Sequence, residues 1–351
     1  MTPDSPILPP QPLPPHDPVA AAPGDANADV PSAPAPLASL VLSEAEIAGA
    51  RRYVEASRAA GTQRAYAGDW RRFSGWCQAR GAPALPATPA LVAVYLASLA
   101  HAGKAPPSVG RALAAIAHAH KRAGLVAPHC AEGGAVVAEV LAGIRRSRLE
   151  PPDKKLAADA DIVMQLLWSI TGDSLAALRD RALIALGMAL AARRSELVAL
   201  DVADLAWEPK GLRVTIRRSK TDQDSEGAVV AVPEGRRLTP LAHLRTWLAA
   251  AAITEGAVFR PLWKGGKRVR AARLSDHAVA RIVQVRAFGA GLDPERYAGH
   301  SLRAGFVTAA ARAGADVWKI QQVSRHKSMQ VLSGYVRDAR LFDDHAGETF
   351  L

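Results

Sequence analysis

Cysteines, aromatic residues and long apolar runs are all scarce in this sequence. Cys77 and Cys130 are its only cysteines, which is too few for a disulfide framework, and their spacing does not match a metal site. This usage is typical of a reducing, cytosolic compartment. The chain opens without a basic segment followed by an apolar run, and no apolar run is long enough to span a bilayer. We therefore expect neither a signal peptide nor a membrane partner.

Aromatic residues make up only 5% of the 351 residues, and alanine inflates the hydrophobic fraction of 49%. Because alanine buries little apolar surface, this composition favours helices that pack closely through small side chains. A chain of this length is long enough for two domains and a sizeable core.

Lysine and arginine are absent from the first fifty residues, which contain six acidic residues. Residues 51–351 therefore hold all 44 basic residues against 27 acidic ones, although the whole chain has a net charge of +11 and a pI of about 10.0. Such an excess predicts a polyanionic partner, with nucleic acid favoured over a membrane. A compositional bias that enriches alanine and arginine together is the alternative explanation.

Residues 1–40 are rich in proline and alanine, so we expect a disordered tail, whereas residues 43–146 predict a helical domain. Ser43 and Glu46 form a capping box for a first helix, and Gly61-Thr62 is expected to end it and to cap a second. Apolar residues recur at helical spacing in that second helix. They predict a buried stripe of Tyr66, Trp70, Phe73 and Cys77.

Three more helices are expected from Thr88-Pro89, Ser108 and about Gly134, and no strand pattern appears between residues 43 and 146. His118 and His120 point to different faces of a helix, so we expect no zinc site and no other metal site. Scattered cations make this domain a candidate for DNA binding. The candidate DNA-binding residues are Arg64, Arg71, Arg72, Arg111, Lys121 and Arg122.

A charged stretch with two prolines at 147–158 predicts a linker, and residues 159–351 predict a second domain. Residues 212–216 and 229–232 read as two short β-strands, which places Lys220 near the turn of a hairpin. The rest of the domain is expected to be helical. Its main helices are expected at 161–170, 175–192, 240–248 and 275–288.

The stretch 297–335 contains two histidines, an arginine and a tyrosine that suit chemistry at a phosphate. His300 and Arg303 are three residues apart and share one helix face, whereas His326 lies at a polar break ahead of Tyr335. Arginine holds two phosphate oxygens in a planar fork, histidine moves protons near neutral pH, and tyrosine can attack covalently. Taken singly, each motif also fits a solvated helix face or ordinary packing near a chain end.

Together with motifs upstream, these residues resemble the tyrosine recombinase (phage integrase) family, of the Cre and Xer type. The resemblance covers roughly residues 43–351. The matching segments are Arg193-Arg194-Ser195-Glu196-Leu197, Lys220 in Ser-Lys-Thr, His300-Ser-Leu-Arg303, His326-Lys-Ser and Tyr335.

Four departures from the family pattern stand close to these motifs. The family usually has Thr-Gly-Leu or Thr-Gly-Met before its first arginine, where this chain has Leu190-Ala191-Ala192. Arg194 replaces a usual aliphatic residue, and Ala304 a frequent polar one. Arg325 replaces the usual glycine before the histidine of the third motif. None of these changes removes a catalytic group.

The resemblance implies a helical core-binding domain and an α+β catalytic domain that clamp DNA. The expected fold is mainly α with a small antiparallel β-sheet. Six residues would be catalytic, with Glu196 orienting a neighbour. Arg193 and Arg303 would bind the phosphate, and Lys220 would be the acid. His300 would be the base, His326 a hydrogen-bond donor and Tyr335 the nucleophile.

The implied function is a site-specific DNA recombinase or integrase that works through a 3′-phosphotyrosyl intermediate without metal, ATP or other cofactor. Its partners would be double-stranded recombination sites. The protein would bind a single site as a monomer or dimer and two paired sites as a homotetramer. A C-terminal tail, residues 336–351, would dock onto a neighbouring protomer, with folding back onto its own domain as the alternative. The protein would be cytoplasmic and nucleoid-associated. A type IB topoisomerase and a catalytically silent DNA-binding regulator are the alternatives.

Overall fold

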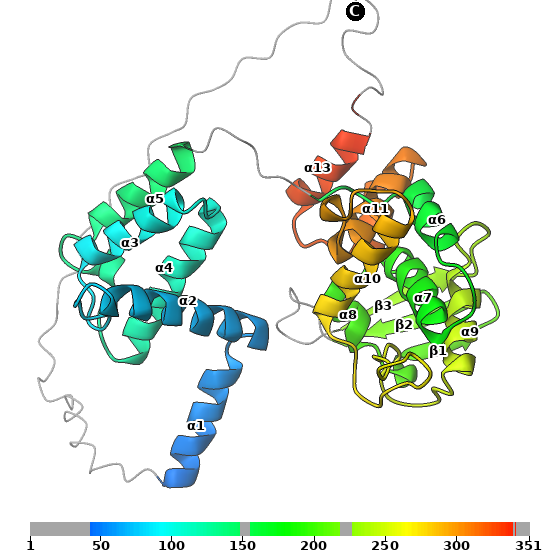
Figure 1. Ribbon diagram of the computed structural model, residues 1–351, viewed down its shortest axis with the longest axis horizontal. Coiled ribbons are helices and arrows are strands. Elements are labelled where there is room, and N and C mark those ends of the chain that lie inside the picture. The colour runs from blue at the N-terminus through cyan, green and yellow to red at the C-terminus, as the bar shows by residue number, and fades with distance from the viewer. Residues whose placement is uncertain (1–42, 148–154, 218–226, 340, 342–351) are drawn as a thin grey trace, which may run out of the picture. The chain divides into compact units, whose positions relative to one another are not determined.

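The computed structural model describes residues 43–147, 155–217, 227–339 and 341 (Figure 1). The predicted tail at 1–40, Lys220, and most of both the predicted linker and the predicted docking segment at 336–351 lie outside these residues. The part that is described is mainly helical with one small antiparallel sheet, which confirms the predicted fold class. In this part no helix combines the length and apolar character needed to cross a membrane.

The described residues 43–147 of the N-terminal region form helices joined by turns and contain no strand, as predicted. Phe73 and Cys77 of the predicted stripe are completely buried, Trp70 packs against the same cluster, and Tyr66 is half-buried. Tyr95, Leu96 and Ile116 complete this core from the next two helices. The helices are α1 (Glu44–Ala56), α2 (Ala60–Gln78), α3 (Pro89–His101), α4 (Pro106–Arg122) and α5 (Ala135–Ser147).

Helix caps account for two correct boundaries and two errors in this region. The Ser43 capping box starts α1, and the Thr88 side chain accepts a hydrogen bond from the backbone of Leu91 at the start of α3. The boundary predicted at Gly61-Thr62 is wrong, because α1 ends at Ala56 and α2 already begins at Ala60. The fourth helix begins at Pro106 rather than Ser108, since proline is well suited to the first helical position.

The C-terminal region consists of helices around a three-stranded sheet in the order β1-β2-β3. Strands β2 (Gly211–Ile216) and β3 (Ala228–Pro233) form the predicted hairpin, with Ile216 opposite Ala228 next to the turn. Strand β1 (Leu205–Glu208) was not predicted, because it is short and mostly exposed and carries no alternating apolar pattern. The helices are α6 (Ala160–Trp168), α7 (Leu175–Ala189), α8 (Arg194–Ala199), α9 (Pro240–Ala250), α10 (Asp276–Gly289), α11 (Gly299–Arg312), α12 (Val317–Ser324) and α13 (Met329–Ala339).

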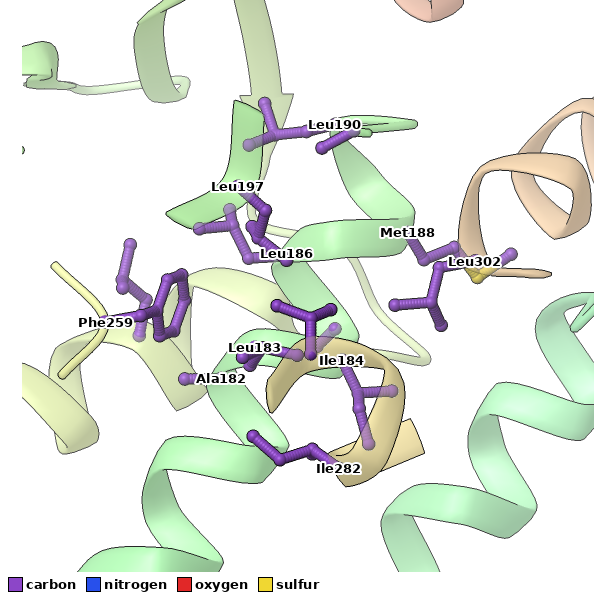
Figure 2. Close-up of a cluster of buried hydrophobic side chains, with 14 of the residues drawn as sticks. Ala182, Leu183, Ile184, Leu186, Met188, Leu190, Leu197, Phe259, Ile282 and Leu302 are labelled. Atoms are coloured by element: carbon purple, nitrogen blue, oxygen red, sulfur yellow. The ribbon is translucent and has the colours of Figure 1, made fainter. Parts of the chain in front are cut away.

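Helix α7 forms the centre of the C-terminal core (Figure 1). Its buried side chains, including Leu183 and Leu186, pack against Leu197 of α8, against Leu302 of α11, and against Phe259 from the segment between α9 and α10 (Figure 2). Every residue from Ala182 to Met188 is buried, so α7 has no solvent-exposed stripe in this part. A helix that is buried all round provides a rigid base for the segments that begin at its C-terminal end.

Helix α11 also packs against the segment that leads into α6. The backbone of Ala158 donates a hydrogen bond to the carbonyl of Ser301 (2.9 Å), and a Cβ atom added at Gly305 would lie 1.7 Å from the carbonyl oxygen of Ala158. Real atoms cannot approach this closely. Glycine at 305 is therefore required for the two backbones to approach each other.

We expect Gly305→Ala to destabilise the protein by about 1–3 kcal/mol, because the added methyl group overpacks a backbone contact that cannot give way. Chemical denaturation followed by circular dichroism measures this effect. Gly143→Ala is the matched control, since Gly143 lies inside α5 with nothing near its Cβ position. That control should be stabilised by about 0.5–1 kcal/mol. Equal unfolding midpoints for Gly305→Ala and the wild type would contradict this interpretation.

Candidate active site

Arg193 lies at the start of α8, directly after a tight turn that ends α7. The helix predicted to run to residue 192 ends at Ala189, because Ala191 adopts a left-handed conformation with φ of 44°. The backbone N–H of Arg193 donates to Oε2 of Glu196 (2.9 Å), and its Nη1 donates to Oε1 of the same carboxylate (2.5 Å). Glu196 thus fixes both the backbone and the guanidinium of Arg193.

Arg303 lies on α11 and is buried, with only 1% of its surface exposed. Its Nη1 donates to the carbonyl of Ala191 (2.7 Å), whereas its Nη2 has no hydrogen-bond partner within the described residues. Burial, followed by the charge of Arg193, lowers the pKa of Arg303 to about 10. A buried, charged donor without a partner is costly, and an anion placed at this point would remove that cost.

His300 begins the same helix and faces the tyrosine of α13. Its Nε2 lies 3.3 Å from the phenolic oxygen of Tyr335, across 35 residues of sequence. Partial desolvation of the ring by neighbouring protein atoms lowers the pKa of His300, and the positive charges of Arg303 and Arg193 lower it further. A neutral imidazole at this distance can accept the phenolic proton. Tyr335 is half-buried and packs with Leu332 and Val307 in a small cluster between α11 and α13.

His326 follows α12, and its imidazole contacts the side chain of Ser324. The Ser324 hydroxyl, which is completely buried, lies 2.8 Å from Nδ1 of His326, and the side chain of Gln321 donates to the carbonyl of His326 (2.9 Å). When Ser324 donates to Nδ1, the proton of the neutral ring lies on Nε2, where it is available to an acceptor. The His326 and Tyr335 rings are 6.2 Å apart.

The structure therefore brings five of the six predicted catalytic side chains to one place, from α8, α11, α13 and the segment after α12. The sixth, Lys220, lies outside the described residues, in the connection between β2 and β3. The catalytic roles of these residues remain predictions. Among the described residues, no group of His, Cys, Asp and Glu is arranged to hold a metal ion.

Two further residues of this site, Arg325 and Ser324, were not predicted as site residues. Arg325 donates to Oε2 of Glu196 (2.9 Å), so the buried carboxylate contacts two arginines. The only signal for Arg325 in the sequence was its replacement of a usual glycine. Ser324 carried no signal, because its contact with His326 depends on how the chain turns after α12.

The predicted DNA-binding residues fall into two groups. Arg64, Arg71, Lys121 and Arg122 are exposed on α2 and α4. Arg72 and Arg111 are exposed as well, but both form ion pairs with Asp69, which is only 4% exposed. Hydrogen bonds and charge from Arg111 and Arg72 outweigh the burial of Asp69, which alone would raise its pKa, and hold that pKa below its usual range. These two arginines therefore have a structural partner, which weakens the case for them as DNA contacts.

The sequence is similar to known integrases and recombinases. The model described as the phage integrase family matches residues 159–340. The chain is 37% identical over 303 residues to an integrase/recombinase xerD homolog of Selenomonas ruminantium, across 85% of this chain and 87% of that protein. It is 25% identical over 287 residues to the recombinase cre of Escherichia phage P1, across 76% of this chain and 81% of that protein.

The fold is also similar to solved structures. A lambda integrase (75-356) dimer bound to a COC′ core site matches with a TM-score of 0.54 and 18% identity, over 83% of this chain and 95% of that chain. A lambda integrase tetramer bound to a Holliday junction matches with a TM-score of 0.53 and 18% identity, over 84% of this chain and 77% of that chain. At this identity the likeness concerns the fold alone.

We expect the His326 imidazole to remain neutral well below neutral pH. Burial, followed by the charges of Arg303 and Arg193, lowers its pKa from 6.5 to about 4. NMR titration of the ring protons measures this, with His326→Gln to assign the resonance. Between pH 6.5 and about pH 4, His326 is protonated in the unfolded chain but neutral in the folded protein. Acidification through this range should therefore also lower the free energy of unfolding. A His326 resonance that titrates near 6.5 would contradict this account.

Proposed function

From the premise that the chain belongs to the phage integrase family and is a site-specific tyrosine recombinase, we propose that Tyr335 is the residue that cleaves DNA. The observation that carries this assignment is the 3.3 Å approach of His300 Nε2 to the phenolic oxygen, together with the buried Nη2 of Arg303, which has no hydrogen-bond partner in the described part of the chain. A nucleophile, a base and a donor for the phosphate are what attack on a phosphodiester requires. The Xer and Cre relatives favour a recombinase over a topoisomerase or a silent regulator.

Activation of the tyrosine depends on its neighbours. A free phenol has a pKa of about 10, so only about one in a thousand is ionised at neutral pH. His300 is neutral under these conditions because its pKa is lowered, and it takes the phenolic proton as Tyr335 attacks phosphorus. The positive field of Arg193 and Arg303 favours the phenolate in the same step.

Charge on the phosphate increases as the tyrosine oxygen approaches. Arg303 places its Nη2 on one non-bridging oxygen, and Arg193, held by Glu196, places its guanidinium on the other. His326 donates a hydrogen bond from Nε2, with Ser324 holding the opposite ring nitrogen. Donors that are fixed before the substrate arrives need no reorganisation during the reaction.

The leaving group is the 5′ oxygen of deoxyribose, which must gain a proton. We assign this proton to Lys220, which the sequence places between β2 and β3. The products are a 3′-phosphotyrosyl bond on Tyr335 and a free 5′ hydroxyl group. Because a phosphoester bond is retained, attack by a 5′ hydroxyl from a second duplex reverses the step without ATP, metal or another cofactor.

Recombination requires two DNA sites to be held together. Relatives include a lambda integrase dimer on a core site and a tetramer on a Holliday junction. We propose the same for this chain, with a monomer or dimer on a single site and a homotetramer on paired sites. The helical residues 43–146 and the catalytic residues 159–351 would form a clamp, joined by 147–158. The C-terminal residues would dock onto a neighbour, and Arg64, Arg71, Lys121 and Arg122 would contact DNA phosphates.

We expect Tyr335→Phe to bind DNA with normal affinity and to form no covalent adduct, because only the attacking oxygen is removed. Incubation with fragmented genomic DNA, followed by denaturing electrophoresis, detects the adduct of the wild type. Sequencing of the attached DNA identifies the target site, and a gel shift on that site measures affinity. A denaturation-resistant protein–DNA complex formed by Tyr335→Phe would rule out this nucleophile.

Lys220→Ala should be inactive on ordinary DNA, because the leaving oxygen then departs without a proton. A substrate with sulfur at the 5′ bridging position of the scissile phosphate restores cleavage, since a thiolate leaves without protonation. Adduct formation on matched oxygen and sulfur duplexes measures the difference. Arg303→Lys is the control, because its defect concerns the non-bridging oxygens and should persist on the sulfur substrate. Equal defects of Lys220→Ala on both substrates would move the acid role to another residue.

A further inference from the structure

Arg325 occupies a backbone position that normally favours glycine. Its φ and ψ are 56° and 41°, in the left-handed region, and its N–H donates to the carbonyl of Gln321 (2.6 Å) to close the end of α12. Residues with a Cβ atom adopt this conformation at a cost. A large charged residue at such a position suggests that its side chain supplies something that glycine cannot.

The side chain of Arg325 reaches from the end of α12 to the segment that carries Arg193. It is only 10% exposed, and its Nη1 donates to the carbonyl of Leu190 (3.2 Å) and to that of Val323 (2.5 Å). Its Nη2 donates to Oε2 of Glu196 (2.9 Å). One guanidinium thus links the backbone next to His326 with the carbonyl of Leu190, where α7 ends, and with Glu196 in the first turn of α8.

Glu196 is the point at which the two catalytic segments meet. Its Oε1 accepts from the Arg193 side chain, and its Oε2 accepts from both the Arg193 backbone and Arg325. Burial alone would raise the pKa of this carboxyl, but the charge of Arg325 and the hydrogen bonds from Arg193 hold it below its usual range. A carboxylate held from two sides leaves Arg193 little freedom to turn away from the site.

We infer that Arg325 is a positioning residue, which acts through Glu196 to orient the Arg193 guanidinium and to fix the loop that carries His326. Arg325 takes over a backbone position usually held by glycine and adds a side-chain link that glycine lacks. It does not itself contact the substrate. This inference rests on the proposed function, because the value of the orientation lies in the phosphate that Arg193 binds.

The test is Arg325→Gly in the full-length chain, on a nicked synthetic duplex with the sequence recovered from wild-type adducts. The nick traps the covalent complex, so the rate of adduct formation is measured separately from DNA affinity. We expect the rate to fall by about 10- to 100-fold, the range reported when residues that orient metal ligands are removed. DNA affinity and melting temperature should stay close to wild type, because glycine relieves the left-handed strain while the ion pair is lost.

Two further variants separate positioning from a purely structural role. Arg325→Lys keeps the positive charge but loses the planar fork, so its rate should lie between those of the wild type and Arg325→Gly. Glu196→Gln weakens the same link from the other side, so its effect and that of Arg325→Gly should not add in the double variant. Ala252→Gly is the backbone control, because Ala252 is an exposed left-handed residue outside the site, with φ of 49°, and its rate should equal wild type.

A wild-type rate for Arg325→Gly, or fully additive effects with Glu196→Gln, would overturn the inference. A parallel loss of rate, affinity and melting temperature in both Arg325→Gly and Arg325→Lys would assign Arg325 to the fold instead. If the wild type itself forms no adduct on genomic DNA, it is the proposed function that fails, and the two failures are thereby distinguished.

Discussion

The buried carboxylate of Glu196, only 2% exposed, is the interaction on which the active site depends. Three arginines gather here, with Arg303 buried, Arg325 mostly buried and Arg193 half-buried, and bringing like charges together with little access to water is unfavourable. Glu196 offsets two of them directly through ion pairs. Arg303 relies on a backbone carbonyl and keeps one buried nitrogen without a partner among the described groups. The positive charge of these arginines is therefore only partly offset by protein groups, which is the basis for the proposal that a phosphate binds here.

Two non-glycine residues beside the candidate site adopt a backbone conformation that favours glycine. Ala191 and Arg325 stand where the family usually has glycine, and both keep a left-handed conformation. Each carries a cost of about 1–2 kcal/mol. The carbonyl of Ala191 accepts from Arg303, and the carbonyl of Leu190 accepts from Arg325. The turn before Arg193 is therefore held by hydrogen bonds from the side chains of Arg303 and Arg325.

The sequence allowed the elements and the composition of the site to be predicted, since both depend on local patterns. The capping box at Ser43, the stripe ending at Phe73 and Cys77, and the hairpin around Lys220 are short-range signals, as is the His300–Arg303 spacing. Contacts between distant segments could not be predicted. The link from Arg325 to Glu196 spans 129 residues, and the pairing of Arg111 with Asp69 spans 42. Each depends on packing that no local pattern encodes.

In the proposed reaction, a tyrosine oxygen replaces a deoxyribose oxygen on the DNA phosphate, and the roles of the other residues follow from this exchange. Mass spectrometry of the covalent complex tests this directly, after the DNA is digested to a short remnant and the protein is cleaved with trypsin. The account predicts that the peptide spanning residues 328–337 carries a nucleotide linked through its 3′ phosphate, and that fragmentation places it on Tyr335. A remnant on Ser328 or Ser333, or a linkage through a 5′ phosphate, would contradict it.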